Sequence, residues 1–172
     1  YLELDVPQFS EFDAHYFPGA DLVMTRMSEP KNYAVRAEPK DRTVLCAEVP
    51  CAVGDRLWTM DDAALGAMIA ADLVRTGLPL LRAPIAVTTR RLPKAYPIYA
   101  TGYDTHFATL DAWADAVPRF LSYGRQGLFA HDNTHHALAM AYGAASCLNA
   151  AGFDREKWRD LRRIFATHVV ED

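Results

Sequence analysis

Cysteine is scarce in this sequence, which has three, Cys46, Cys51 and Cys147, among 172 residues. Their odd number and apolar surroundings do not suit a scaffold held by disulfides, so we expect three buried, reduced thiols. A signal-peptide pattern and an apolar run long enough to cross a bilayer are also absent. We therefore expect a cytoplasmic protein and no membrane association, although a missing amino terminus would hide any targeting signal.

An excess of positive charge is absent as well. The 18 basic and 22 acidic side chains give a formal net charge of −4, which argues against nucleic acid as a partner. No GxSxG elbow occurs, and no Ser-His or Cys-His pairing suggests an activated nucleophile, so acyl transfer is not expected. With 51% hydrophobic and 23% charged residues, the composition is that of a folded domain with one core.

What the sequence does contain is a stretch near its end, residues 120–148, rich in glycine, histidine and alanine. The apolar residues 120–123 predict a short strand, and residues 124–127, Gly-Arg-Gln-Gly, predict a tight turn. Residues 131–136 open an alanine-rich helix that Asp132 or Asn133 can cap.

This strand, turn and helix start could bind a ligand. The positive end of a helix dipole favours a phosphate, a carboxylate or an electron-rich ring edge, and Arg125 adds a fork of donors. Gly124 and Gly127 would let the backbone approach a flat cofactor. The same residues also fit a plain packing turn, and the pattern alone leaves both interpretations open.

The rest of the chain shows strand and helix patterns in turn. Apolar runs predict strands over residues 2–6, 22–27, 43–49, 83–91 and 96–101. Helical periodicity predicts helices over 60–76, 107–117 and 153–168, the last being basic and amphipathic and expected to dock on its own domain. This order predicts an α+β fold, with an antiparallel or mixed sheet and flanking helices that lead to the final strand, turn and helix.

The first predicted helix has the clearest signals. Thr59 with Asp62 predicts a capping box at its start. Its core-facing stripe is expected to consist of Leu65, Met68, Ile69 and Leu73. The second helix repeats apolar residues at the same spacing, namely Phe107, Leu110, Trp113, Ala114 and Val117.

Residues 124–145, GRQGLFAHDNTHHALAMAYGAA, resemble the carboxy-terminal segment of the FAD-dependent oxidoreductases grouped with amine oxidase, protoporphyrinogen oxidase and UDP-galactopyranose mutase. In that group the last strand and helix of the FAD domain return to the flavin after the chain has made a substrate domain. Residues 25–33, TRMSEPKNY, resemble a mutase-like TRxxExKxF pattern, and residues 91–99, RLPKAYPIY, resemble a tyrosine-bearing strand that faces substrate.

The resemblance implies roles for particular residues. The residues expected to contact FAD are Gly124, Arg125, Gly127, Asn133, Thr134 and His136. The residues expected to face a small-molecule substrate are Arg26, Lys31, Tyr96 and Tyr99. An imidazole near the flavin, such as that of His136, would alter the stability of the reduced ring.

The sequence also departs from this group. No glycine trio has the GxGxxG spacing of the turn that holds the FAD pyrophosphate. Residue 1 is Tyr, and the first residues begin in the middle of an alternating strand pattern. We therefore expect a carboxy-terminal part of a longer chain, whose FAD-binding domain comes from the same gene or from a separate subunit.

These expectations divide the chain into three parts. Residues 1–118 would belong to the substrate-binding domain, residues 119–150 would be the returning element of the FAD domain, and residues 151–172 would form a carboxy-terminal amphipathic helix. The function expected is the substrate-binding portion of an amine oxidase-like, FAD-dependent oxidoreductase, incomplete for catalysis by itself.

Three alternatives remain open. A mutase-like enzyme would use reduced flavin for an isomerisation without net redox change. A non-catalytic binding or assembly half would dock on a separate FAD subunit. A metal-binding protein would use His131 and His135, which are four residues apart and so share one helical turn.

Overall fold

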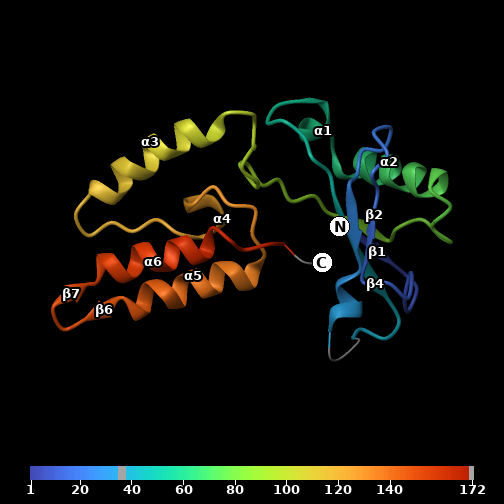
Figure 1. Ribbon diagram of the computed structural model, residues 1–172. Coiled ribbons are helices and arrows are strands. Elements are labelled where there is room, and N and C mark those ends of the chain that lie inside the picture. Colours follow the sequence, from blue (N-terminus) through green and yellow to red (C-terminus); the bar gives the residue numbers. More distant parts are fainter. Residues whose placement is uncertain (35–37, 171–172) are drawn as a thin grey trace. The chain divides into compact units, whose positions relative to one another are not determined.

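The structure, a computed structural model, describes residues 1–34 and 38–170. By its internal contacts the chain divides into two compact units, Tyr1–Pro93 and Lys94–Asp172 (Figure 1). Each unit is described by itself below. The expected boundaries after residues 118 and 150 concern function and not compactness, and they stay predictions.

The first unit is built on an antiparallel sheet. Its five strands lie in the order β2-β3-β4-β1-β5, and every neighbouring pair is antiparallel. The strands are β1 (Leu2–Leu4), β2 (Ala14–Tyr16), β3 (Arg26–Ser28), β4 (Thr43–Glu48) and β5 (Ala86–Val87). With six α-helices among the described residues, the chain has the α+β fold that the sequence predicts, and the sheet is antiparallel.

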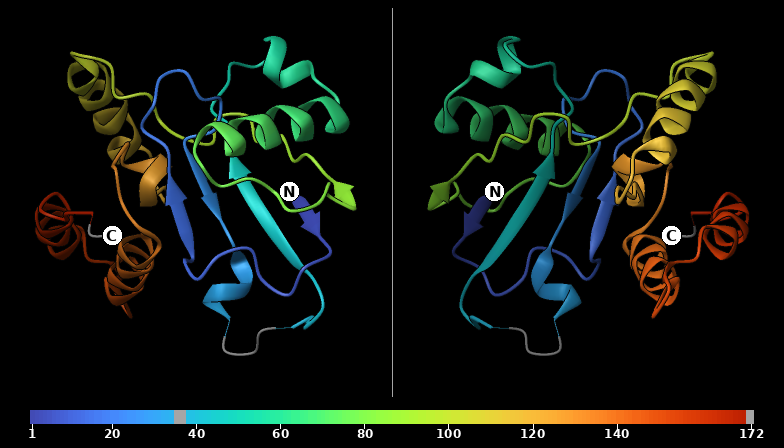
Figure 2. Two further views of the ribbon diagram at one scale, coloured as in Figure 1. Left: turned by 90° about the vertical axis from the view of Figure 1, so that its right-hand side faces the viewer. Right: turned by 90° about the vertical axis from the view of Figure 1, so that its left-hand side faces the viewer.

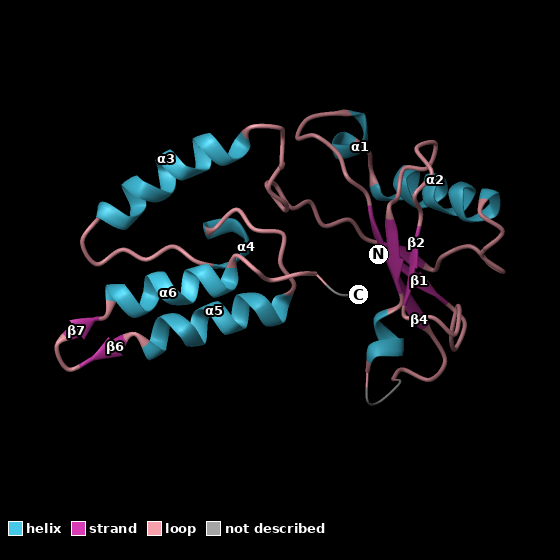
Figure 3. Cartoon of the chain, in the orientation of Figure 1, coloured by secondary structure: helices cyan, strands magenta, loops and turns pink. Residues whose placement is uncertain are grey.

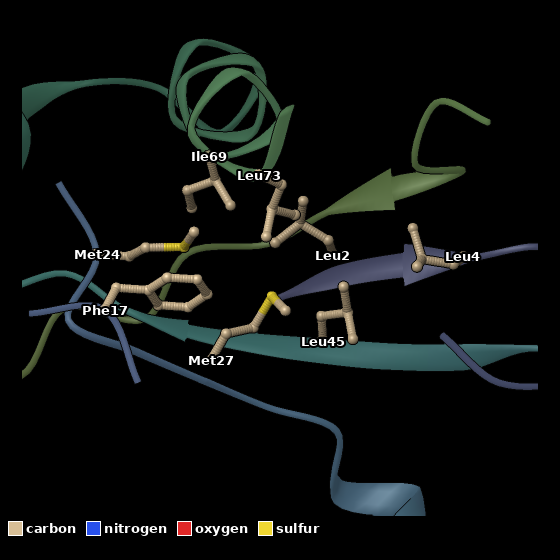
Figure 4. Close-up of a cluster of buried hydrophobic side chains, with 8 residues drawn as sticks. All are labelled: Leu2, Leu4, Phe17, Met24, Met27, Leu45, Ile69 and Leu73. Atoms are coloured by element: carbon tan, nitrogen blue, oxygen red, sulfur yellow. The ribbon is translucent and has the colours of Figure 1, made fainter. Parts of the chain in front are cut away.

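A long helix, α2 (Asp62–Arg75), covers one face of this sheet (Figure 2). Its residues Leu65, Ile69 and Leu73 are buried, as predicted, whereas Met68 is only half-buried. Figure 4 shows Ile69 and Leu73 pointing from the helix toward Leu2 and Met27 on the strands. The core that these residues form also contains Leu4, Phe17, Met24 and Leu45.

The start of α2 differs from the predicted capping box. Asp61 is the N-cap, and its carboxylate accepts a hydrogen bond of 2.7 Å from the backbone N–H of Ala64. Thr59 instead ends a separate short helix, α1 (Arg56–Thr59), where its hydroxyl donates to the carbonyl of Asp55. Because Thr59 serves the preceding turn, the cap falls two residues later.

Several strand boundaries in this unit also differ. Strand β2 was not predicted, because its three residues lie in an aromatic segment without clear alternation; pairing with β3 makes it a strand. The predicted strand 22–27 is found as β3, which begins at Arg26, and the predicted strand 83–91 is reduced to β5. A 3₁₀ helix, η1 (Pro30–Tyr33), follows β3.

The second unit consists mainly of helices and loops (Figure 3). Its helices are α3 (Tyr103–Ala116), α4 (Gly124–Gly127), α5 (Thr134–Ser146) and α6 (Arg155–Phe165). A hairpin of β6 (Leu148–Asn149) and β7 (Gly152–Phe153) joins α5 to α6. These two helices lie side by side (Figure 1) around a core of Met140, Ala144, Cys147, Trp158 and Phe165.

The packing of α6 against α5 confirms that the basic tail docks on its own domain. Gly143 makes this close contact possible, because a Cβ there would lie 2.9 Å from the Cζ atom of Phe165. Trp158 and Phe165 are 2% and 7% exposed. Leu161 packs against the same core, whereas Ile164 remains exposed.

Two predicted strands of this unit are wrong: neither residues 96–101 nor residues 120–123 form a strand. A strand persists only where its backbone groups are paired with a neighbour, and no strand in the described part of this unit lies beside either segment. Pro97 also removes a backbone donor from the first of these segments. The tight turn predicted at residues 124–127 is the short helix α4. Residues 120–146, predicted as strand, turn and helix, therefore form a loop, the short helix α4, a second loop and the helix α5.

Two further findings concern the predictions from composition. Cys147 is buried and Cys46 partly so, but Cys51 is exposed, because it lies in the loop between β4 and α1. All three cysteines are free thiols, as expected. Within residues 1–34 and 38–170, no helix has the length and apolar character that a membrane crossing requires.

Candidate functional site

The segment that carries the two predicted substrate tyrosines lies against α4. The side-chain amide of Gln126 donates to the carbonyls of Lys94 and Ala95, at 2.9 and 3.1 Å. These bonds hold residues 94 and 95, the start of this segment, in place without a sheet. They explain how a segment that lacks strand partners still has a defined place within the second unit.

Arg125 links this segment to the start of α5. Its guanidinium lies over the ring of Tyr96, with the Cζ atom 5.0 Å from the ring centroid, a distance typical of a cation–π contact. Its Nε donates to the main-chain oxygen of Asp132 at 2.8 Å, and its Nη2 donates to the same oxygen. The residue therefore bridges three segments of the chain.

An aromatic cluster adjoins Arg125. The ring of Tyr99 lies 5.5 Å from that of Tyr103, 5.3 Å from that of Phe129 and 6.1 Å from that of His131. All three contacts are edge-to-face, the arrangement that aromatic quadrupoles favour. Phe129 adopts a left-handed backbone angle, φ 50°, which directs the chain from α4 back toward α5.

The hydroxyl of Tyr99 stays protonated at neutral pH. Burial raises its pKa, and this effect is opposed by the positive charge of Arg125 and reinforced by Tyr103 and Asp132. A neutral phenol can donate a hydrogen bond to a carbonyl or an amine. Tyr99 is itself 37% exposed, and Tyr96 is 56% exposed.

The start of α5 follows the predicted cap. Asn133 is the N-cap, and it forms a reciprocal capping box with His136, whose Nδ1 accepts from the Asn133 amide at 3.2 Å. Thr134, the first residue of the helix, is exposed. Asn133 and His136 thus have structural roles in addition to the cofactor roles that the resemblance implies.

The two glycines of α4 also have local explanations. Gly124 has φ +82°, a backbone angle that favours glycine. A Cβ at Gly127 would lie 2.7 Å from the Oγ of Ser122, whose hydroxyl donates to the Gly127 carbonyl. Close packing within the unit accounts for Gly127, so its presence does not require a ligand.

The two histidines expected as alternative metal ligands are both exposed. His131 contacts Tyr99, and the ring of His135 lies 4.0 Å from that of His136. The structure gathers a different set: ligand atoms of Asp132, His136 and His168 lie within 4.8 Å of one another. The sequence pattern missed His168, because only the return of the chain through α6 brings it to the start of α5.

Arg26 and Lys31 lie in the first unit, and both are engaged there. Arg26 pairs with Glu48 at 2.8 Å, and its guanidinium lies 5.7 Å from the Tyr16 ring centroid. The ammonium of Lys31 donates to three backbone carbonyls, including that of Arg42 at 3.0 Å. These bonds stabilise the loops of that unit, and a substrate role for either residue stays a prediction.

The first unit also has a pocket of about 290 Å³. The sequence did not predict it. It lies between the end of β1 and the segment after α2. Apolar residues such as Leu4, Phe9 and Leu78 form most of its lining. Asp5 and Arg82, at its rim, form an exposed ion pair of 3.4 Å.

Comparisons of this chain with protein-family models, with curated proteins and with solved structures found no match.

Proposed function

We propose that this chain is the carboxy-terminal, substrate-binding portion of an amine oxidase-like, FAD-dependent oxidoreductase. The observation that carries the proposal is the assembly around Arg125. Segments that are separate in the sequence, around Tyr96, Arg125 and the start of α5, meet there through the contacts described above. They are the segments for which the resemblance implies flavin and substrate contacts.

The chemistry of this assembly fits a flavin ring better than a complete dinucleotide. The rings of Tyr96 and Tyr99 offer flat apolar surface, and Arg125 offers positive charge beside it. Such surroundings suit a planar ring that accumulates negative charge on reduction. The pyrophosphate would need the glycine-rich βαβ unit, which this sequence does not contain.

The residues of this chain would bind and orient rather than carry the redox step. When bound, the flavin supplies hydride or electron transfer from a reduced carbon centre such as an amine. Arg125, Asn133 and Thr134 would lie along its ring and ribityl chain. Tyr99, with its neutral hydroxyl, would donate a hydrogen bond to the substrate, and Tyr96 would pack against it.

Exposed apolar side chains on α3 support the expectation of a further domain. No residue of this helix is buried, and Leu110 and Trp113 are 66% and 67% exposed. A helix whose apolar stripe is open to solvent loses the stabilisation that burial normally supplies. An FAD-binding domain, from the same gene or from a separate subunit, would be a suitable cover.

The first experiment is the absorbance spectrum of the protein purified gently from its native cells, followed by analysis of the denatured supernatant. We expect a flavin spectrum, released flavin, and either a longer chain or a second polypeptide that contains the FAD domain. A colourless protein that neither retains nor takes up FAD would contradict the proposal.

Arg125→Ala tests the site itself in that complete protein. Loss of a charge-assisted hydrogen bond corresponds to at least about tenfold weaker FAD binding. Because Arg125 also holds the Asp132 carbonyl, flavin content must be normalised to folded protein by circular dichroism. Arg163→Ala is the matched control, since that side chain is 78% exposed. Equal flavin content in the two variants would remove Arg125 from the site.

A further inference from the structure

Three polar side chains meet beneath the surface of the second unit. Asp132 precedes the N-cap of α5, His136 lies in its first turn, and His168 follows the end of α6. Their side chains are 3%, 12% and 17% exposed. The turn after α6 places His168, whose backbone N–H donates to the carbonyl of Phe165 at 3.1 Å. Packing of α6 on α5 therefore builds the cluster.

Two separations within the cluster are longer than ordinary hydrogen bonds and are compatible with a shared metal ion, and the stacked rings of His136 and His168, whose centroids lie 4.3 Å apart, would turn relative to each other to bind it. Oδ1 of Asp132 lies 3.4 Å from Nδ1 of His136 and 3.7 Å from Nδ1 of His168. Both separations exceed the usual range for a hydrogen bond to a carboxylate. Two ligands bound tetrahedrally to Zn²⁺ at about 2.0–2.1 Å are separated by roughly 3.4 Å.

Two of the buried polar atoms also lack a partner. Oδ2 of Asp132 and Nδ1 of His168 have no hydrogen bond within the described residues. A buried, unpaired polar atom is costly, and such an atom in a folded protein calls for an explanation such as an ion. The hydrogen bonds of Arg125 do not satisfy Oδ2 of Asp132, because they go to the main-chain oxygen of that residue.

We propose that Asp132, His136 and His168 form a binding site for a divalent transition metal ion of the Zn²⁺ type. Two imidazoles and one carboxylate are a common donor set for such ions. Three protein ligands would leave a coordination position for water. Nδ1 of His136 now accepts a hydrogen bond from the Asn133 amide at 3.2 Å. A metal ion bound to Nδ1 would replace this hydrogen bond, because the atom has a single lone pair.

The metal would join the segment after α6 to the start of α5. Both lie beside the core that contains Phe165, whose ring is 5.5 Å from that of His168. An ion bound only by the folded unit stabilises it by mass action. Of the residues expected to contact flavin or substrate, only His136 is also a proposed metal ligand. The metal site can therefore be tested in the absence of flavin.

The test is titration calorimetry of ZnCl₂ into the untagged 172-residue chain, previously treated with EDTA. We expect one ion per chain and a higher Tm in the presence of Zn²⁺. His168→Ala and Asp132→Asn should each weaken binding at least tenfold, a lower bound taken from the effects of losing outer-shell partners. His136 is left unchanged, because it also caps α5.

His135→Ala is the matched control, since His135 is an exposed neighbour of the cluster and is not one of its ligands. It should leave the Zn²⁺ affinity unchanged. Circular dichroism shows whether His168→Ala and Asp132→Asn are folded. If one of them is not, the Zn²⁺ affinity of the other tests the proposal. Two results would overturn the proposal: no Zn²⁺ binding by the folded chain, or binding that survives in folded His168→Ala and Asp132→Asn. Replacement by Co²⁺ gives a second readout, because tetrahedral sites absorb visible light much more strongly than octahedral ones.

Discussion

At the scale of single residues, the buried carboxylate of Glu29 has a central place in the first unit. Glu29 is 2% exposed. Its Oε1 accepts from the Phe9 amide at 2.9 Å and from the Thr43 hydroxyl at 2.6 Å, and its Oε2 accepts from the Ser10 amide at 3.0 Å. A buried charge is tolerated when several donors satisfy it in this way. Glu29 thereby ties the loop after β1 to the sheet.

Glu29→Ala should therefore destabilise the protein strongly. The change leaves two backbone amides and a hydroxyl without their acceptor, at about 1–3 kcal/mol each when the groups stay buried. We expect the free energy of unfolding to fall by about 3 kcal/mol or more in urea titrations followed by circular dichroism.

Glu48→Ala provides the comparison for this prediction. Glu48 pairs with Arg26, and its side chain is 38% exposed. A surface pair of this kind contributes about 0–1 kcal/mol. If Glu29→Ala lowered stability no more than Glu48→Ala, the buried network would not have the importance that its hydrogen bonds indicate.

At the scale of elements, the contact between α2 and β5 depends on the absence of a side chain at Gly66. Gly66 lies inside α2, where glycine is less favourable than alanine by about 1 kcal/mol. A Cβ at this position would lie 2.7 and 3.2 Å from the two methyl groups of Val87. Close approach of the helix to the edge strand explains a residue that helix propensity alone disfavours.

Gly66→Ala should therefore lower stability in spite of its better helix propensity. Overpacking costs about 1–3 kcal/mol, and we expect a net loss in the same urea titrations. The double variant Gly66→Ala with Val87→Ala should be more stable than the sum of the two single changes predicts.

Ala67→Gly measures the propensity term separately, because Ala67 is an exposed neighbour in the same helix. It should cost about 1 kcal/mol. A stabilising effect of Gly66→Ala would show that the helix can move away from β5 at little cost.

At the scale of the whole molecule, the division after Pro93 predicts two regions of independent stability. Arg90, Arg91 and Lys94 are exposed beside this boundary. Exposed connecting segments are preferred sites of proteolysis. The first unit contains the complete five-stranded sheet and the eight-residue buried core that Figure 4 shows.

Limited trypsin treatment should therefore cut first in residues 90–94, and a fragment of residues 1–93 should retain its structure. We expect this fragment to unfold cooperatively when it is heated and followed by circular dichroism. Residues 94–172, with a smaller buried core, serve as the comparison and should unfold at a lower temperature. Early cleavage within α2, or a non-cooperative 1–93 fragment, would contradict the division.

Residue patterns predicted much of the fold because local periodicity reports which face of an element is buried. The stripe of Leu65, Ile69 and Leu73 identified the core face of α2. The amphipathic pattern of residues 153–168 likewise predicted a helix that docks on its own domain, and Trp158 and Phe165 of α6 are buried against α5. Failures occurred where structure depends on a distant partner. Residues 96–101 and 120–123 have strand-like composition, but they have no strand to pair with in the described part of their unit.

By itself the sequence determined the class of the fold, the helices with strong periodicity and a helix cap at Asp132 or Asn133, since these follow from short-range sterics and hydrogen bonding. Only the tertiary structure decided which distant residues share a site. Arg125 meets Tyr96, and His168 joins Asp132 and His136, because chain segments tens of residues apart return to the same place. Spacing along the sequence favoured His131 and His135 as a metal pair instead. Local periodicity carries no information on such returns, which depend on how helices and loops pack.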